Sequence, residues 1–307
     1  MTRKQVPVYQ SLLTTQYKLP DVEDDSDKED RGRILIVGGS KEQPGGIILA
    51  ALAALRVGVG KLRIATCESI ASGIAITIPE SRVFSLPETK SGHISRDAAQ
   101  LIAKQGNAVN CVLIGPGMVE EEEGVELVKN LLPLLNTGDK GPAIVLDAVG
   151  FAILSKKYEN QNILERFNNK VIITPHLGEA ASLLGVEKSE IKKNPDKYVE
   201  DASKLFGAVV ALKGSKTHIV SPNHEELFIR DVGGVGLATS GSGDVLSGAI
   251  AGIASGNADL LTATLWGCYL HGKAGLLLEK KVGRVGFIAR EIVDQIVVVY
   301  NDLCSEK

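Results

Sequence analysis

Aromatic residues are scarce in this sequence: Phe, Trp and Tyr make up 4% of its 307 residues, with a single tryptophan. The core must therefore consist of Ala, Val, Ile and Leu, the usual composition of parallel sheets covered by helices. Hydrophobic residues account for 44% of the chain. This is enough apolar material for one large α/β domain, and the length does not demand two.

Clustered basic residues and long hydrophobic runs are also missing. The net charge is −3, and no basic cluster interleaves with aromatics, which argues against nucleic acid or an anionic membrane as a partner. The apolar stretch from Gly45 to Val59 is short, rich in glycine and interrupted by Arg56, so it is not a membrane span. The N-terminus lacks the apolar core of a signal peptide. We therefore expect a cytoplasmic protein without membrane contact.

Cysteine is rare, and its spacing does not suit a metal site. The four cysteines lie far apart at Cys67, Cys111, Cys268 and Cys304, and none has a catalytic context. Free thiols in a reducing compartment are the simplest interpretation.

The chain divides into a polar beginning and one long α/β segment. Residues 1–31 are polar and end in a dense charge run, which predicts a solvated N-terminal arm. Residues 32–307 are interpreted as one domain. Within it, short β-branched runs such as Arg33 to Val37 and Lys61 to Thr66 alternate with helical patterns. Strand–helix–strand units imply parallel pairing, so we expect a largely parallel sheet with helices on both faces.

Glycine is abundant, and its densest stretch runs from Gly233 to Gly256. The stretch reaches Gly241-Ser242-Gly243-Asp244 and then becomes apolar with helical spacing. A glycine-rich loop at a helix start binds anions, because free N–H groups and the helix dipole favour negative charge there. The pattern predicts a phosphate site.

Asp244 is the unusual residue of this loop. A carboxylate beside a bound phosphate repels it, unless its task is to take a proton from the group that attacks the phosphate. An ordinary aspartate cap is the competing interpretation. The surrounding glycines and the apolar helix that follows favour a catalytic base.

Other glycine or proline turns follow expected strands. The run ending at Ile114 is followed by Gly115-Pro116-Gly117, and the run Val171 to Ile173 by Thr174-Pro175-His176. Ligands of open α/β sheets bind outside the carboxyl ends of strands. A plain turn remains the alternative at each position. A Rossmann site is disfavoured, since GGSKEQPGG after the first strand lacks the G-x-G-x-x-G spacing.

Several of these segments together resemble a known family. ATSGSGDVLSG resembles the anion-hole and base motif of the ribokinase-like superfamily, and with GCYLHG, GPG and TPH-x-GE it resembles the ADP/ATP-dependent NAD(P)H-hydrate dehydratases. The resemblance covers residues 32 to the end and implies a ribokinase-like fold. It implies a repair reaction in which the (S)-epimer of hydrated NADH or NADPH is phosphorylated on its C6 hydroxyl. Phosphate then leaves, and loss of the C5 proton restores the reduced cofactor.

The resemblance assigns roles to named residues. It implies that Asp244 is the base and that Gly46, Ile47, Gly117, His176 and Asp244 contact the hydrate. It places the nucleotide against Lys213, Gly214, Ser215, Lys216 and Thr217, and its phosphate on Gly241, Ser242 and Gly243. Glu179 and Asp147 are expected to hold Mg²⁺ through water, with helix capping as the alternative for both. Val149 stands where the family has a second aspartate.

The resemblance also suggests cofactors and partners. ADP is the expected phosphoryl donor, with ATP less favoured, together with Mg²⁺. A separate NAD(P)H-hydrate epimerase is expected as a functional partner, because the N-terminal arm is too short to be that domain, and a homo-oligomer is expected. A vitamin-precursor or sugar kinase of the same fold is the alternative function. A nucleotide-sensing module without catalysis is disfavoured by the presence of Asp244.

Overall fold

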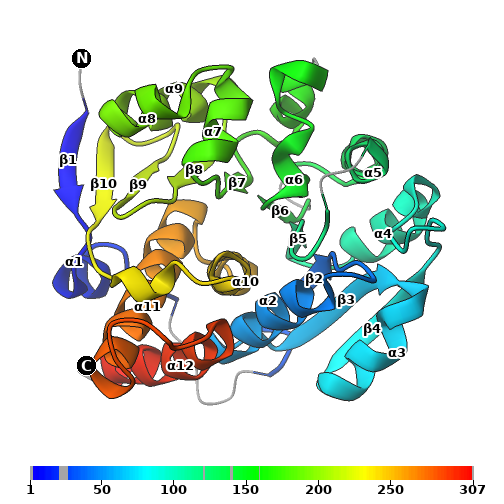
Figure 1. Ribbon diagram of the computed structural model, residues 1–307, viewed down its shortest axis with the longest axis horizontal. Helices are drawn as coiled ribbons and strands as arrows, with labels where there is room; N and C mark the ends of the chain where they lie inside the picture. Colours follow the sequence, from blue (N-terminus) through cyan, green and yellow to red (C-terminus); the bar gives the residue numbers. More distant parts are fainter. Residues whose placement is uncertain (1–2, 21–26, 120–121, 139–140, 159, 306–307) are drawn as a thin grey trace.

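The computed structural model describes residues 3–20, 27–119, 122–138, 141–158 and 160–305. Within them one sheet is formed, with strand order β1-β10-β9-β8-β7-β6-β5-β2-β3-β4 (Figure 1). The strands are β1 (Lys4–Pro7), β2 (Arg33–Val37), β3 (Lys61–Cys67), β4 (Ser81–Leu86), β5 (Cys111–Ile114), β6 (Ala143–Leu146), β7 (Val171–Ile173), β8 (Val209–Leu212), β9 (Thr217–Val220) and β10 (Glu226–Arg230).

The sheet is parallel except around β9, which runs antiparallel to both β8 and β10. A turn at Ser221-Pro222-Asn223 follows β9 and leads toward β10, so these two strands form a hairpin. The predicted α/β class, with a mostly parallel sheet between helices, is confirmed.

Helices cover both faces of the sheet (Figure 1). One face is packed, through a shared hydrophobic core, by α1 (Gln10–Thr15), α2 (Pro44–Arg56), α3 (Glu68–Thr77), α10 (Ser242–Ser255), α11 (Leu260–Lys281) and α12 (Ala289–Ser305). The other face carries a second core, formed with α4 (Ala99–Gly106), α5 (Glu122–Leu131), α6 (Val149–Ala152), α7 (Leu177–Leu184), α8 (Lys188–Lys193) and α9 (Pro195–Phe206).

The strand order reverses between β2 and β5. From β2 the chain moves outward through β3 and β4, returns to β5 beside β2, and then proceeds to β8 in the opposite direction. The turns after β2 and β5 therefore meet, and the Gly39 N–H donates to the Pro116 carbonyl at 2.8 Å. In open α/β sheets such a reversal opens a crevice for ligands at the carboxyl ends of the strands.

Helix α10, which follows the glycine loop, is the most deeply buried central helix. Its residues from Val245 to Ser255 are all buried. It packs closely on α2 because glycines face that helix: a Cβ added at Gly248 would lie 2.2 Å from the Ala50 carbonyl oxygen. Any side chain at Gly248 would push the two helices apart and tilt the phosphate loop at the start of α10.

Two elements begin later than the sequence indicates, each for a local reason. The strand expected from Ala108 begins at Cys111, because the N–H of Ala108 still bonds back to Gln105 in the turn after α4. The final helix, expected from Gly283, begins at Ala289, since Gly283 and Gly286 have φ values of +137° and +105°. Such φ values lie outside the helical region.

Part of the segment predicted as a solvated arm is built into the fold. Strand β1 pairs in parallel with β10 at the sheet edge. Leu13 of α1 is fully buried, and the Trp266 indole N–H donates to the Tyr17 carbonyl at 2.7 Å. The polar composition of the segment concealed this, because an edge strand needs few apolar residues. Asp21 to Ser26, in the charge run, lie outside the described residues.

The cysteines at 67, 111 and 268 are buried free thiols, as expected. No helix in the described part of the chain has both the length and the apolar character that crossing a membrane requires.

Candidate functional site

The candidate site lies where the β2 and β5 turns meet the start of α10. Gly241 caps α10 in the left-handed conformation, with a φ of +85°, and Ser242, Gly243 and Asp244 form the first turn. The N–H groups of a first helical turn have no partner within the helix. Those of Gly243 and Asp244 therefore suit an anion, as the sequence predicts.

Asp244 lies against the two turns assigned to the substrate. A Cβ added at Gly46 would be 3.0 Å from the Asp244 carboxylate and 2.5 Å from the Gly117 nitrogen. Gly46 therefore packs against both Asp244 and Gly117, and only glycine fits at position 46. Ile47 was expected beside them, but its side chain is fully buried in the hydrophobic core. Its backbone alone adjoins the site, since its nitrogen is 3.3 Å from the Cβ position of Gly117.

The Asp244 carboxyl is poised to bind a proton near neutral pH. Burial, and then the charge of Asp147, raise its pKa to about 6, although Lys213 and the Gly117 backbone N–H oppose the shift. A general base works best when its pKa lies near the working pH. An aspartate that served only as a cap would gain nothing from this shift.

Lys213 connects Asp147 with the start of α10. It follows β8, and its Nζ donates to the Asp147 carboxylate at 2.9 Å, while the Thr174 hydroxyl donates to the same oxygen at 2.8 Å. The Nζ also lies 3.5 Å from the Cβ position of Gly243 in the phosphate loop. Burial lowers the pKa of Lys213, but the carboxylates of Asp147 and Glu179 outweigh this and raise it, so the ammonium stays charged.

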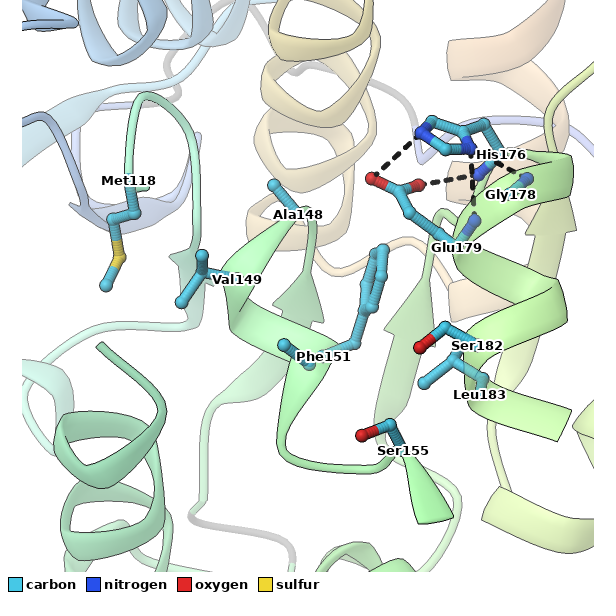
Figure 2. Close-up of a pocket in the computed structure, with 11 residues that line it drawn as sticks. Met118, Ala148, Val149, Phe151, Ser155, His176, Gly178, Glu179, Ser182 and Leu183 are labelled. Carbon is cyan, nitrogen blue, oxygen red and sulfur yellow. Dashed lines mark hydrogen bonds and ion pairs between the residues drawn. The ribbon is translucent and has the colours of Figure 1, made fainter. Parts of the chain in front are cut away.

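His176 and Glu179 form a reciprocal cap at the start of α7 (Figure 2). The His176 Nδ1 accepts from the N–H groups of Gly178 and Glu179 at 3.0 and 3.1 Å, and Glu179 accepts the His176 N–H at 2.7 Å. Because Nδ1 is an acceptor, the proton of a neutral ring resides on Nε2. This Nε2 lies 3.5 Å from the Glu179 carboxylate, and the His176 side chain is 59% exposed, so a ligand can reach the edge of the ring. Glu179 therefore caps the helix, which is the alternative role given to it above. Burial raises the pKa of its carboxyl group.

Beside this cap lies a cavity of about 320 Å³. Figure 2 shows Met118, Val149 and Phe151 on one side of it and the His176 cap on the other. Ala148 on its wall has an unusual φ of +46°. Non-glycine residues in this region are strained, and such strain gathers at ligand sites.

A larger cavity of about 730 Å³ is lined by Lys213 and shares His176 with the first one. Its wall includes four of the residues assigned to the nucleotide, namely Lys213, Gly214, Ser215 and Thr217, together with Ser242 and Gly243 of the phosphate loop. Lys216 was assigned to the same group, but its ammonium pairs with Asp231 at 2.7 Å and it does not line the cavity.

A family model described as NAD(P)H-hydrate dehydratase matches residues 34–297. The chain belongs to this family. It is 39% identical over 277 residues to an ADP-dependent (S)-NAD(P)H-hydrate dehydratase of Xanthomonas campestris, covering 90% of this chain and 91% of the relative. A bifunctional NAD(P)H-hydrate repair enzyme of Moorella thermoacetica is 35% identical over 96% of this chain, which spans 54% of that relative.

Solved structures agree with the family assignment. An ADP/ATP-dependent NAD(P)H-hydrate dehydratase of Bacillus subtilis, co-crystallised with ATP and Mg²⁺, has a TM-score of 0.79 and 27% identity, with 99% of each chain covered. A hydroxyethylthiazole kinase of Pyrococcus horikoshii has a TM-score of 0.59 at 16% identity over 91% of this chain and 93% of that one. The second likeness shows the shared ribokinase-like fold alone.

The sequence did not indicate that two further residues, His271 and Arg230, line the larger cavity. His271 is buried, and its Nε2 lies 2.9 Å from the Ser242 hydroxyl at the start of α10. Burial, and then the charge of Arg230, lower the pKa of His271 to about 3, so the ring is neutral. Arg230 ends β10 and also lines the cavity. His271 belongs to the GCYLHG motif, but that motif carried only the resemblance and no role for the histidine, and Arg230 stands in no motif.

Proposed function

We propose that this chain is an ADP-dependent (S)-NAD(P)H-hydrate dehydratase that restores NADH or NADPH from its hydrate. The observation that carries the proposal is the position of Asp244. Its carboxylate touches the Gly46 and Gly117 turns on one side, and its own helix start adjoins Lys213 on the other. A hydroxyl on the substrate side and a phosphate on the nucleotide side would thus meet at one carboxylate.

In the first step, Asp244 takes the proton of the C6 hydroxyl as that oxygen attacks the terminal phosphorus of the nucleotide. A positioned base typically contributes about 10²–10⁴-fold. The amides of residues 241–244 and the Lys213 ammonium stabilise charge on the transferring phosphoryl group. One such donor is typically worth about 10²–10³-fold. With ADP as donor, AMP is the second product.

In the second step, the C6–O bond breaks and phosphate leaves with the bonding electrons. The lone pair of the adjacent ring nitrogen assists the departure, and loss of the C5 proton forms the C5–C6 double bond. The protein has little covalent work to do, so positioning dominates. His176 suits the hydrate, because its exposed ring lines the cavity beside Met118 and Phe151, while two N–H groups of α7 hold its Nδ1 and Glu179 lies 3.5 Å from its Nε2.

The carboxylates of Asp147 and Glu179 fit Mg²⁺ only in a limited way. Among the described residues, no group of three or more His, Cys, Asp or Glu side chains is arranged to hold a metal. Asp147 already accepts bonds from Lys213 and Thr174. However, Mg²⁺ commonly keeps several waters and is held by one or two carboxylates plus substrate phosphates. Asp147 and Glu179 would hold it in this way, and its charge would offset that of the phosphates.

The test is restoration of reduced nicotinamide from purified (S)-hydrate. The protein is incubated with hydrated NADH, Mg²⁺ and either ADP or ATP at equal concentration, and the absorbance of NADH is followed. We expect NADH and inorganic phosphate to appear together, faster with ADP. Turnover far faster with ATP would reject the choice of donor. A kinase acting on another alcohol would instead leave the phosphate attached, without NADH formation.

A further inference from the structure

Arg230 is a buried cation in the wall of the nucleotide cavity. It is 6% exposed. One terminal nitrogen, Nη2, donates to the Thr217 hydroxyl, and the other, Nη1, donates to the Val232 carbonyl. In the described part of the chain, its Nε has no partner. Thr217 and the segment after Val232 both line the cavity, so Arg230 ties two walls of it together.

The guanidinium is held in place by close packing. A Cβ added at Gly233 would lie 2.8 Å from Arg230 Nη1, and one added at Gly272 would lie 3.2 Å from its Cδ. The side chain therefore passes closely between the β10 turn and α11, and only glycine fits beside it at these two positions.

The charge of Arg230 is not neutralised by an adjacent carboxylate. Among the described residues, none forms an ion pair with it; Asp231, the carboxylate that most favours its charge, is paired with Lys216 at 2.7 Å. Lys213 differs, because Asp147 compensates it at 2.9 Å. Burial lowers the pKa of Arg230, which shows that the fold bears a cost for this charge.

The charge acts inside the cavity. It is the second cause, after burial, of the low pKa of His271, whose ring contacts Ser242 of the phosphate loop. A cavity with walls of low dielectric constant concentrates the field of a charge in its lining. An anion in this cavity would therefore feel Arg230 even without touching it.

We propose that Arg230 is a positioning and specificity-determining residue for the nucleotide. It fixes Thr217 and the Val232 segment as walls of the cavity, and its uncompensated charge favours a nucleoside polyphosphate over the uncharged nucleoside. The proposal rests on the proposed function in one respect, namely that this cavity receives the nucleotide donor.

Two variants separate charge from shape. Arg230→Gln keeps an amide donor near Thr217 but removes the charge, whereas Arg230→Lys keeps the charge. Arg63→Gln is the matched control: Arg63 is partly buried, also bonds to a carbonyl, and lies on β3 in the other half of the sheet. Calorimetry with the full-length protein would give the Kd values for ADP and for adenosine, and turnover assays the KM for hydrated NADH.

We expect Arg230→Gln to raise the Kd for ADP by about tenfold or more, since the lost charge acts at short range in a shielded cavity. Its Kd for adenosine and its KM for the hydrate should change less than about threefold, and Arg230→Lys should restore most of the ADP affinity. Equal losses for ADP and adenosine, or no rescue by lysine, would overturn the assignment. Tight ADP binding by the parent protein without NADH formation would refute the proposed function but not the role of Arg230.

Discussion

Replacing Asp244 by asparagine separates a catalytic base from a residue that only stabilises the first turn of α10. Asparagine has nearly the same shape and caps helices as well as aspartate does, but its amide does not take up a proton at neutral pH. Turnover should fall by about two to four orders of magnitude, the usual contribution of a positioned base. The KM for hydrated NADH should change little, because the contacts with Gly46 and Gly117 involve the shape of the side chain.

The stability of this variant follows from the pKa of Asp244. Folding raises this pKa from its ordinary value of 3.8 to about 6. A carboxyl with a raised pKa favours the folded state below pH 3.8, and this contribution is lost as the pH rises through about 6. At neutral pH the ionised group therefore destabilises the fold, by at most about 3 kcal/mol. Removing the charge should leave the melting temperature unchanged or raise it.

Two measurements at several pH values test this reasoning. In the parent protein, kcat/KM should rise with pH around about 6, because only the ionised carboxyl accepts a proton. The residual activity of Asp244→Asn should lack this step. The variant should melt no earlier than the parent at pH 8 and should lose any advantage at pH 4. Turnover within a few-fold of the parent, combined with earlier melting, would show that Asp244 only stabilises the first turn of α10.

The remaining predictions concern the cap, the ion pair and the metal. His176→Asn keeps a hydrogen-bond acceptor for the first turn of α7, so it should weaken hydrate binding about tenfold at an unchanged melting temperature. His176→Ala should weaken hydrate binding and also lose about 1 kcal/mol of stability. A loss of nucleotide affinity equal to the loss of hydrate affinity, measured by calorimetry, would contradict this. Lys213→Met leaves Asp147 buried without its cation and should destabilise the fold by about 3 kcal/mol in urea unfolding, whereas Lys213→Met combined with Asp147→Asn should recover part of that. Chelation of Mg²⁺ should weaken ADP binding but leave hydrate binding unchanged, and equal effects on both would count against a phosphate-linked metal.

How far the sequence predicts the site depends on how local each signal is. Gly241 to Asp244 form one continuous loop, so spacing alone predicted a helix start with free N–H groups. The bond between Lys213 and Asp147 joins residues far apart in the sequence, and it requires β6, β7 and β8 to be neighbours, as they are. The spacing of apolar residues predicts strands but not their order. The position of Arg230 in the cavity wall was not predicted either, because an arginine at the end of a strand usually faces water.

The arrangement of charges explains why phosphate loop, lysine and carboxylates occur together. Asp147 and Glu179 both raise the pKa of Lys213, while Asp147 raises that of Asp244. The carboxylate charge around Lys213 thus serves two purposes: it keeps the ammonium protonated beside the phosphate loop, and it brings the base toward neutral pH. The same charge repels a nucleotide, which needs cations in compensation. Lys213 and the guanidinium of Arg230, both in the wall of the larger cavity, would supply part of this compensation, and Mg²⁺ held through water by the carboxylates, as proposed above, would supply the rest.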